Sequence, residues 1–508
     1  MKQFSAVIDI GANSMRLVIY SHIGFFRVQE VENVKMVAYL RNHLDNDSNL
    51  TSEGLVVLID TLSSFQKVIK SYELDHFICA ATSAIRMAEN REDIKERVKK
   101  ETGLTMTLLS EEEEAYYGYF AVVNSTSFEE GFTVDIGGGS TEITYFKDRE
   151  LIHSHSFPFG SLTLMEFIDV NNSSNKQLDR LREFIYDHFS QLDWIDEKNV
   201  PIIGIGGSAR NMVEIDQTYK DYPLAGLHQY EMFDSDIEQI SQHLIKLNKK
   251  QTEDIEGLSK DRAESILPAM QVFYCLYNLT KASQFVLSRK GLREGIFYEQ
   301  LSGNINRHLY HNVLQNSIEE LIQEYELYPD QAAYNRDLTK KLYYPLIDSG
   351  LSSILSARDW DIMKYACDVY NLGSYVDSES SSQHSFYLLA NRTIDGLTHK
   401  ERLRLALLAS FKNKNVYKRF LKPYKNWFSK SERQKLRILG AILKLAYSLN
   451  STKRQVVSDV NVSVEEEKIF IECFCNQDYK PEAYQAEKQK KHLEKALNTQ
   501  INISFHNH

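Results

Sequence analysis

The sequence contains little of what stabilises small secreted domains or anchors a chain in a membrane. Its 508 residues include only five cysteines, scattered without a C-x-x-C pair, and only eight prolines. Such sparse cysteines argue against a disulfide framework or a zinc site and favour a reducing cytoplasm. No apolar run approaches the roughly 18 residues of a membrane helix, and Asp9 interrupts the first apolar run too early for a signal peptide. We therefore expect a cytoplasmic protein without a membrane partner.

What the sequence does contain is an ordinary globular composition in a long chain. Hydrophobic residues make up 43% and charged residues 25% of the sequence, which excludes extensive disorder. A chain of 508 residues exceeds the size of one hydrophobic core, so we expect several domains. The net charge of −11 is unfavourable for meeting a polyanion, although net charge governs solubility and encounter more than what one cleft can hold.

One motif occurs twice along the chain. The sequence reads AVIDIGANSMRLVIY at residues 6–20 and FTVDIGGGSTEITYF at residues 132–146. In both copies a strand-forming run leads into an acidic glycine loop and a second strand-forming run follows at once, which predicts an antiparallel hairpin. A third strand is expected after each hairpin, near Phe25–Val31 and over Leu151–Phe157. The other predicted elements are strands Phe4–Ile10, Met15–Tyr20, His76–Ala80, Phe132–Ile136, Glu142–Phe146 and Pro201–Ile205, and helices Val56–Tyr72 and Leu178–Phe189. The pattern predicts a duplicated α/β architecture with domains at 1–124 and 125–304.

The remainder of the chain differs in character. Glycine becomes rare and amphipathic helical patterns dominate, which predicts an all-helical domain at 305–450. In the final segment, 451–508, alternation over Val456–Cys475 predicts a hairpin, Pro481–Leu497 a helix and Ile501–Phe505 a last strand. We expect a small α+β domain there, with Cys473 and Cys475 on one buried face.

The two glycine loops are of a kind that binds phosphate through the backbone. Strand-forming residues follow them, which excludes a dinucleotide fingerprint that opens a helix, and no lysine follows, which excludes a Walker loop. What remains is a hairpin whose backbone N–H groups turn outward as an anion-binding nest. Asp9 and Asp135, at the strand ends, would hold Mg²⁺ against the phosphates. A tight turn explains one such loop, but two near-identical loops in duplicated halves favour a phosphate clamp.

A third glycine element, GIGGSARNM at 204–212, follows a strand and precedes a predicted helix whose N–H groups could also serve an anion. Alone, this element supports a ligand site and a plain turn equally. Hydroxyl groups in the loops would add hydrogen-bond donors. The candidate phosphate-binding residues of the three elements are Gly11, Asn13, Ser14, Gly137, Gly138, Gly139, Ser140, Thr141, Gly206, Gly207 and Ser208.

Seven segments in order resemble one protein family. They are DIGANS, ATSAIRMA, LLSEEEEAYYGY, VDIGGGSTE, FPFGSLTL, GIGGSA and LSRKGLREGIFYE, within residues 4–300. Together they resemble the exopolyphosphatase/guanosine pentaphosphate phosphatase family of the actin-like superfamily, whose two ribonuclease-H-like halves close on a phosphate cleft. The segment 305–450 resembles, more loosely, the helical HD-like domain of the family's long form, and a small fourth domain fits that layout. The resemblance implies hydrolysis of terminal phosphate from inorganic polyphosphate, or of the 5′ γ-phosphate from guanosine pentaphosphate. It also implies Mg²⁺, with a monovalent cation as a further candidate, and a homodimer.

The resemblance gives Glu114 the central role. Glu114 matches the family's glutamate that positions and deprotonates the attacking water. A structural explanation exists for the acidic run SEEEE as a whole, because Ser110 and Glu113 can form a capping box and acids are favoured in a first helical turn. Glu111, Glu112 and Glu113 are therefore expected to be helix-start residues.

Five more residues match the family's motifs. Asp135 and Glu142 match carboxylates that hold Mg²⁺ and orient water, so Glu142 is a second catalytic candidate; an exposed strand charge is the alternative. Arg86 matches an arginine that faces the phosphates, which a guanidinium fork suits. Arg293 and Glu294 match as well, but an intrachain ion pair explains them equally, and we assign them no chemistry. We expect the second loop to carry more of the chemistry, because Glu142 follows it where the first loop has Leu17.

The sequence also departs from the family in places. Where the family often has an Arg-Leu-Gly-x-Gly run, the stretch Tyr39–His43 lacks the leading arginine and the glycines, which argues against a phosphate contact there. The best match to an HD-type metal pair reads Tyr370-Asn371, so no metal ligation is expected in the helical domain. His384 matches a family histidine and is expected to be structural.

A basic segment offers a local answer to the negative net charge. Between Lys412 and Lys444 there are eight lysines and three arginines against the single acid Glu432, with aromatic residues between them. Solvated helix faces and a track for polyphosphate both explain this composition, and basic plus aromatic residues also suit single-stranded nucleic acid, a partner that we do not expect. The candidate polyanion track is Lys418, Arg419, Lys422 and Lys425.

Four functions remain open at this point. The first is a Mg²⁺-dependent exopolyphosphatase and the second, in the same class, is a guanosine pentaphosphate phosphatase; the sequence does not separate them, although the long form and the basic segment favour the polymer. The third is an actin-like nucleotide-binding switch or sugar kinase. The fourth is an inactive relative that binds polyanions or nucleic acid without turnover.

Overall fold

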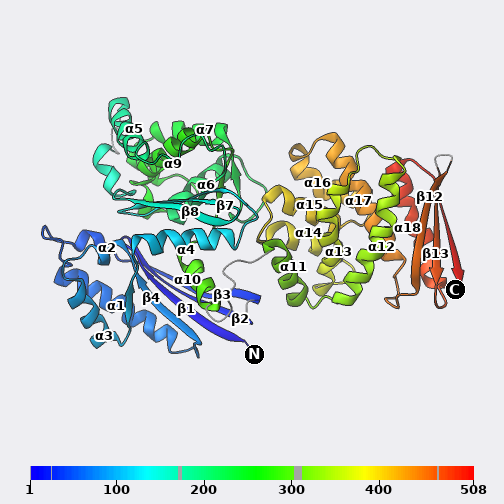
Figure 1. Ribbon diagram of the computed structural model, residues 1–508, viewed down its shortest axis with the longest axis horizontal. Coiled ribbons are helices and arrows are strands. Elements are labelled where there is room, and N and C mark those ends of the chain that lie inside the picture. The colour runs from blue at the N-terminus through cyan, green and yellow to red at the C-terminus, as the bar shows by residue number, and fades with distance from the viewer. Residues whose placement is uncertain (1, 24–25, 170–173, 303–311, 466–467, 508) are drawn as a thin grey trace. The chain divides into compact units, whose positions relative to one another are not determined.

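The computed structural model describes residues 2–23, 26–169, 174–302, 312–465 and 468–507 (Figure 1). The chain divides into two compact units. The N-terminal unit comprises Met1–Tyr222 and Leu227–Val313, and the C-terminal unit comprises Pro223–Gly226 and Leu314–His508. None of the described helices is both long and apolar enough to cross a membrane.

The first half of the N-terminal unit is built on a five-stranded sheet of order β3-β2-β1-β4-β5. The pairs β1–β2 and β2–β3 are antiparallel, whereas β1–β4 and β4–β5 are parallel. The strands are β1 Gln3–Ile10, β2 Ser14–Ile23, β3 Phe26–Val37, β4 His76–Ala81 and β5 Met106–Leu108, and the helices are α1 Ser52–Ile69, α2 Ser83–Arg86, α3 Arg91–Thr102 and α4 Glu111–Val123. The predicted third strand is longer than expected and begins at Phe26; Phe25 lies outside the described residues.

The second half repeats this plan. Its sheet has the order β10-β11-β9-β6-β7-β8, so that β8-β7-β6-β9-β11 corresponds to β3-β2-β1-β4-β5 with the same strand directions. The strands are β6 Gly131–Ile136, β7 Thr141–Lys147, β8 Glu150–Phe157, β9 Ile202–Ile205, β10 Glu231–Met232 and β11 Phe285–Leu287, and the helices are α5 Asn175–Phe189, α6 Gly206–Tyr219, α7 Asp234–Ile245, α8 Lys249–Glu253, α9 Ile266–Thr280 and α10 Leu292–Ser302. The matching order confirms the internal duplication predicted from the two glycine loops.

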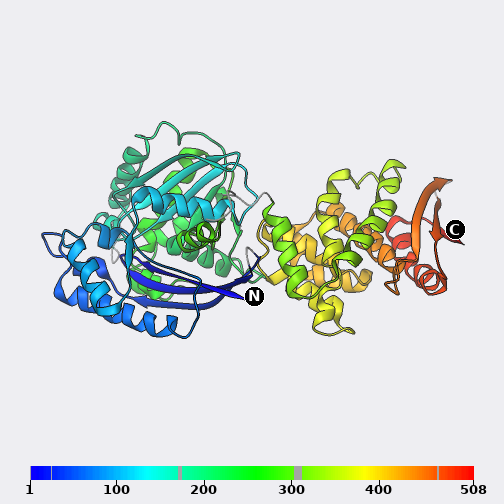
Figure 2. The same cartoon turned by 60° about the horizontal axis from the view of Figure 1, so that its bottom comes forward.

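Helices α4 and α10 lie between the two sheets (Figures 1 and 2). Val7 of β1, Phe146 of β7, Ile203 of β9 and Phe297 of α10 are fully buried in one apolar cluster, so residues of both halves share this core. The two helices approach each other closely, because a β-carbon on Gly295 of α10 would lie 2.1 Å from the carbonyl oxygen of Tyr117 on α4. A side chain larger than hydrogen at position 295 would therefore force the helices apart.

Polar contacts reinforce the joint between the halves. Tyr117 of α4 donates from its hydroxyl to the Glu299 carboxylate of α10 at 2.6 Å, and Tyr20 of β2 donates to Glu294 at 2.8 Å. On the edge strand β3, Lys35 forms an ion pair with Asp261 of the second half at 2.8 Å. The two halves thus form a single unit through both apolar packing and charged contacts.

The described residues of the C-terminal unit between 313 and 448 contain helices and short 3₁₀ turns but no strand. The helices are α11 Val313–Glu324, α12 Pro329–Asp348, α13 Trp360–Asp368, α14 Ser381–Asn391, α15 His399–Ala409, α16 Lys414–Leu421 and α17 Lys430–Ser448. Serine and threonine caps set several helix starts; Ser429, for example, accepts from the Glu432 N–H while Glu432 accepts from the Ser429 N–H.

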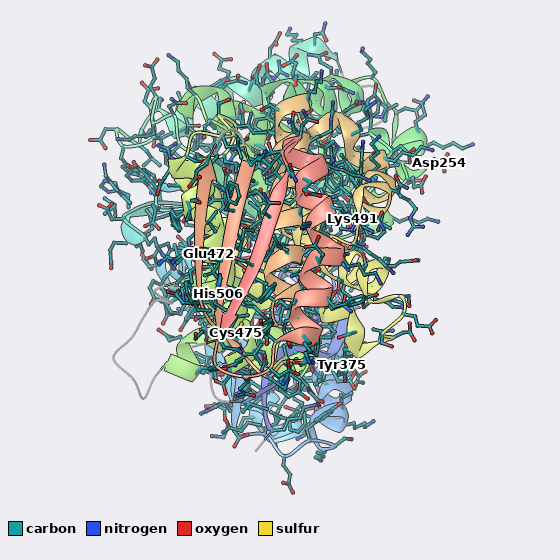
Figure 3. All side chains as sticks on the ribbon, turned by 90° about the vertical axis from the view of Figure 1, so that its right-hand side faces the viewer. Asp254, Tyr375, Glu472, Cys475, Lys491 and His506 are labelled. Carbon is teal, nitrogen blue, oxygen red and sulfur yellow. The ribbon has the colours of Figure 1, made fainter. Side chains whose placement is uncertain are left out.

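The chain ends in a three-stranded sheet of order β12-β13-β14 with one helix beside it (Figure 3). The elements are β12 Val457–Glu465, β13 Lys468–Cys475, α18 Lys480–Leu497 and β14 Ile501–Asn507. Cys473 and Cys475 alternate onto the buried face of β13, as their spacing predicts, and all five cysteines are buried free thiols.

Candidate active site

The site is built on the two glycine hairpins, which we call the first hairpin (β1–β2) and the second hairpin (β6–β7). Both loops close with the same backbone bond, from Gly11 N–H to Ser14 carbonyl at 3.1 Å and from Gly137 N–H to Ser140 carbonyl at 2.9 Å. The loops lie against each other, since a β-carbon on Gly138 would be 3.6 Å from the Cβ of Ala12. The sequence duplication therefore brings its two copies to one place.

The third glycine element completes the group of loops. Gly206, at the start of α6, has φ of +78°, and a β-carbon there would lie 2.2 Å from Oδ1 of Asp135. Only glycine combines this left-handed conformation with such close approach to a carboxylate. The first turn of α6, with its N–H groups unpaired within the helix, thus lies beside the acid of the second hairpin.

Two predicted phosphate ligands are engaged elsewhere. The Thr141 hydroxyl is fully buried and donates to the Phe159 carbonyl at 2.8 Å, and the Ser208 hydroxyl donates to the Ile136 carbonyl at 3.2 Å. We therefore withdraw the expectation that these two hydroxyls donate to a ligand. Asn13 differs from both, because its buried Oδ1 has no hydrogen-bond partner within the described residues.

Glu114 is held in the first turn of α4 by the predicted capping box. The Ser110 hydroxyl accepts from the Glu113 N–H at 3.1 Å, and the Glu113 carboxylate accepts from the Ser110 N–H at 2.7 Å. Glu114 takes no part in this capping box. Its carboxylate accepts from Arg86 Nη1 at 2.5 Å, and the side chain is 14% exposed. Burial raises the pKa of Glu114 despite the opposing effect of Arg86.

The main partner of Arg86 is therefore the Glu114 carboxylate. Besides that carboxylate, its Nη1 donates to the Leu109 carbonyl at 2.9 Å, and its Nη2 lies 3.7 Å from Glu111. These contacts fix the guanidinium beside the candidate base. The remaining N–H groups of Arg86 are the ones that could meet a phosphate, as the resemblance implies.

Glu142 and Asp135 face each other across the second hairpin. The strand register pairs Asp135 directly with Glu142, and Glu142 is 7% exposed, which removes the alternative of an exposed strand charge. Burial, followed by repulsion from Glu114 and Asp135, raises the pKa of Glu142, while Ser156 donates to its carboxylate at 3.2 Å. Burial and the neighbouring Asp9 raise the pKa of Asp135 to about 6. Carboxyl groups from both hairpins and from α4 are thus close enough to repel one another.

The first hairpin places cations where the second places acids. Arg16, not Leu17, pairs in register with Asp9, which corrects the expectation drawn from the sequence. The Asp9 carboxylate accepts from Arg293 Nη1 at 2.8 Å, so Arg293 of the GLREG motif does form an ion pair, with the first hairpin's acid. Glu294 instead accepts from Tyr20 and from the Gly291 N–H.

Several arginines gather around these carboxylates. Arg16, Arg210 and Arg262 are half-buried, and burial lowers the pKa of each. Arg293 further lowers the pKa of Arg16 and of Arg210, so these cations are near one another. Arg262 also donates from Nη1 to the Ser208 hydroxyl at 3.2 Å. This concentration of guanidinium groups gives a net-negative protein a local region for an anion.

Arg41 lies against the second glycine loop, in a stretch for which the sequence argued against a phosphate contact. A β-carbon on Gly139 would lie 2.2 Å from Arg41 Nη1, so the guanidinium rests directly on the second glycine loop. The stretch Tyr39–His43 therefore does reach the loops, although it lacks the family's glycines. Its backbone also joins the first loop, because the N–H groups of Tyr39 and Arg41 donate to the carbonyls of Asn13 and Ala12.

The sequence analysis did not identify four arginines of the site, although the positions of two of them could have been recognised from the sequence. Arg16 stands opposite the first aspartate once the two hairpins are aligned residue by residue, and Arg210 follows directly after the GIGGSA element. Arg41 was not considered, because the sequence argued against a phosphate contact in the stretch Tyr39–His43. Arg262 comes from a 3₁₀ turn, Lys260–Arg262, that only the tertiary fold brings to the loops.

The candidate polyanion track lies in the C-terminal unit, on α16 and the following 3₁₀ helix. Lys418, Arg419, Lys422 and Lys425 are exposed, and no described residue forms an ion pair with them. Of the aromatic residues of this segment, Tyr417, Phe420, Tyr424 and Phe428 are buried and Trp427 is half-buried. The Arg419 guanidinium lies 5.5 Å from the centroid of the Phe420 ring. The four buried rings offer little surface for stacking of nucleic-acid bases. His384 lines a shallow pocket together with Arg419 and Phe420.

Comparison with known proteins identifies the family. The family model of the Ppx/GppA phosphatase family matches residues 5–303, and the model of Ppx/GppA phosphatase domain III matches residues 313–496. The chain belongs to the Ppx/GppA phosphatase family. The Aquifex aeolicus member of that family is 25% identical with a TM-score of 0.55, and the match covers 60% of this chain and 100% of that chain. An exopolyphosphatase from Cytophaga hutchinsonii shares the fold at 21% identity and a TM-score of 0.55, over 61% of this chain and 100% of that one.

Membership of the Ppx/GppA phosphatase family confirms the resemblance drawn from the seven motifs, and it makes the chain a member of a family of hydrolases. The helical segment, whose resemblance was looser, matches the family's third domain. The residues discussed above therefore lie in a phosphatase scaffold, and their geometry can be considered in terms of phosphate chemistry.

Proposed function

We propose that this protein is an exopolyphosphatase that releases terminal orthophosphate from inorganic polyphosphate by attack of water. The observation that carries the proposal is the setting of Glu114, which is held by Arg86 and faces the carboxylates of both hairpins. A general base works best when its pKa is close to the working pH, and burial moves the pKa of Glu114 in that direction. Glu114 would orient a water molecule and accept its proton as the oxygen attacks the terminal phosphorus.

The arginine groups would hold the substrate. Phosphoryl transfer needs an aligned nucleophile and neutralised oxygens more than covalent help from the protein. Backbone N–H groups of the glycine loops, together with Arg41 and Arg262, lie where they can bind the non-bridging oxygens. Arg16, Arg210 and Arg293 lie near one another and would hold phosphate groups next to the one being released.

The residues present fit Mg²⁺. Asp9, Asp135 and Glu142 offer hard oxygen ligands, the buried carboxylates repel one another, and the Oδ1 of Asn13 is a buried acceptor without a partner. No three carboxyl, imidazole or thiol side chains of the described residues lie together as a metal site, so Asp9, Asp135 and Glu142 would share an ion only with water and substrate oxygens as the remaining ligands. When bound, Mg²⁺ would neutralise the charge of the transferred phosphate.

The exposed cations on α16 and the following 3₁₀ helix favour a polymer as the substrate. Four exposed cations without carboxylate partners give this surface a positive potential, and a long polyanion would engage several of them at once. Guanosine pentaphosphate 5′-phosphatase activity is the second candidate, because the arginines around the hairpins suit any substrate with successive phosphates.

The test is phosphate release from long-chain polyphosphate, guanosine pentaphosphate and ATP by the wild type and by Glu114→Gln. We expect polyphosphate to be the best substrate and Glu114→Gln to abolish release, with Glu112→Gln as a matched control in the same helical turn that retains it. Activity that survives in Glu114→Gln would refute the assignment of the base. Preference for guanosine pentaphosphate would favour the second candidate, and preference for ATP would favour an actin-like nucleotide enzyme.

A second experiment addresses the track. Charge reversal of Lys418, Arg419 and Lys422 together should weaken the turnover of long chains far more than that of tripolyphosphate. Equal effects on both lengths would show that these cations do not guide the polymer.

A further inference from the structure

The C-terminal unit contains a pocket that the proposed reaction does not use. Its volume is about 640 Å³, within the range of small-molecule sites in proteins. Residues of α12, α17 and α18 form its walls, and the loops that follow α11 and α13 form its rim. All of these elements belong to the C-terminal unit, so the pocket can be described without reference to the other unit.

The floor of the pocket is polar and fixed. The rings of Tyr370 and Tyr447 lie 4.0 Å apart between centroids, and the Tyr447 hydroxyl donates to the Cys367 carbonyl at 2.6 Å. Beside them, Asn450 donates from Nδ2 to Oδ1 of Asn335 at 3.1 Å. Side chains that hold one another in this way give a preformed surface for a ligand.

The rim carries two largely exposed tyrosines, and a cation of the lining already lies over one of them, since Lys453 Nζ is 5.3 Å from the centroid of the Tyr328 ring. Tyr328 is 67% and Tyr375 is 57% exposed, although both are large aromatic residues beside a pocket (Tyr375 is labelled in Figure 3). Tyr325 meets Tyr375 edge to face at 5.4 Å and so braces it. Exposed and braced aromatic rings are the surfaces on which protein sites stack planar heterocycles.

The wall formed by α18 offers free amide groups. Gln485 and Gln489 are one helical turn apart, so their side chains lie on the same face, and both line the pocket. Neither amide has a hydrogen-bond partner among the described residues, and both side chains are half-buried. A primary amide can donate and accept at once, which matches the edge of a nucleobase or the hydroxyls of a ribose.

A cation without a counter-ion completes the lining. Lys444 of α17 donates from Nζ to the Lys412 carbonyl, and no carboxylate of the described residues forms an ion pair with it. Burial, together with Lys412 and Lys491, lowers the pKa of Lys444 to about 8, so its charge is poorly compensated. Of the acids that also line the pocket, Asp368 is neutralised by Arg336 and Glu326 is exposed. An anion beside Lys444 would relieve this imbalance.

We propose that this pocket binds a nucleoside phosphate, with the base against the tyrosine rim, its polar edge toward Gln485 and Gln489, and the phosphate beside Lys444. A bare phosphate chain would leave the tyrosines and the amides unused, and a neutral sugar would leave Lys444 without an anion. This site is separate from the hairpins and does not depend on the proposed hydrolase activity.

The test is equilibrium binding of AMP and GMP to the full chain carrying Glu114→Gln, measured by titration calorimetry. We expect one bound nucleotide per chain and an affinity that falls about tenfold or more in Tyr375→Ala, because stacking on the ring is lost. Lys444→Gln should cause a loss of similar size. The matched controls are Tyr387→Ala, another largely exposed tyrosine, on α14, and Lys430→Gln, an exposed lysine on α17; both should bind as the parent does.

Three further measurements keep the proposal open to refutation. Guanosine should bind more weakly than GMP, and tripolyphosphate should not displace GMP at equal concentration. With Glu114 intact, Tyr375→Ala should hydrolyse polyphosphate at the parental rate, which distinguishes this pocket from the hairpin site. Unchanged GMP binding in both pocket variants, displacement by tripolyphosphate, or no measurable nucleotide binding would each overturn the proposal.

Discussion

The two glycine hairpins share a backbone plan but place opposite charges across from their aspartates. In the first, the strand register sets Arg16 opposite Asp9, and Arg293 neutralises that acid. In the second, it sets Glu142 opposite Asp135; Glu142 is buried, Asp135 is half-buried, and each has other acids close to it. Under the proposed function, this one cross-strand position would distinguish the hairpin that holds phosphate from the hairpin that acts on the reacting phosphate. The duplicated hairpins have the same backbone arrangement, but the residues opposite their aspartates carry opposite charges.

The largest expected effect tests this asymmetry directly. Glu142→Gln should lower kcat by about 10²–10⁴-fold with little change in KM, because the residue acts on the reacting phosphate. Arg16→Gln, at the equivalent position of the first hairpin, should instead raise KM about tenfold and leave kcat near its original value. Steady-state kinetics with polyphosphate measures both. Equal losses of kcat in the two variants would break the comparison.

The ion pair of the first hairpin gives the next effect. Arg293→Met leaves the Asp9 carboxylate in a mostly buried site without its partner, which should cost about 3 kcal/mol of the free energy of unfolding. Urea denaturation of the N-terminal unit's transition measures this loss. Asp9→Asn in the same background should restore part of it, since the unpaired charge is then removed. A loss of stability below about 0.5 kcal/mol would show that Asp9 does not need its arginine.

Glycine substitutions sharpen the comparison at the backbone. Gly206→Ala should destabilise by about 2 kcal/mol, because alanine is strained at φ of +78° and its β-carbon would meet the Asp135 carboxylate. Gly11→Ala should cost about 1 kcal/mol, since its β-carbon would lie 3.1 Å from the Ser14 carbonyl in an ordinary conformation. Thermal unfolding distinguishes the two. The reverse order would mean that the first loop is the more constrained.

The smallest effect concerns Arg41, which bridges from the first half to the second loop. Arg41→Ala should raise KM for polyphosphate about fivefold, as expected for one charge-assisted hydrogen bond in a half-exposed site, with kcat preserved. Arg97→Ala, an exposed arginine on α3, is the control and should leave KM unchanged. An unaltered KM in Arg41→Ala would place this side chain outside the substrate's reach.

Local patterns in the sequence were sufficient to predict the hairpins, because a strand, a glycine loop and a strand meet through neighbouring residues alone. The pairing of Asp135 with Glu142 follows from that register, and so does the pairing of Asp9 with Arg16 that direct alignment of the two loops would have found. Thr141 was misplaced for a related reason. In a strand successive side chains alternate between faces, and its hydroxyl turns inward to the Phe159 carbonyl.

Residues brought in from a distance could not be predicted in this way. Arg262 reaches the Ser208 hydroxyl only because a 3₁₀ turn packs beside α6, and no local periodicity encodes that contact. The aromatic residues of the basic segment are the opposite case. Tyr417, Phe420 and Tyr424 recur at helical spacing, which is itself a signal for the core, and the structure buries all three.

The close contact of Gly295 with Tyr117 has a mechanical meaning. Where two helices pack backbone against backbone, no side chain between them can change rotamer to let them slide, so this contact is expected to be a fixed point between the two halves. Glu114 stands on one of these helices and Arg293 on the other. A rotation of one half against the other about this contact would displace outer contacts such as Lys35 with Asp261 more than it displaces residues next to the two helices. Under the proposed function, the first turns of α4 and α10 would therefore move less than the edge strand β3 when the halves open for substrate exchange.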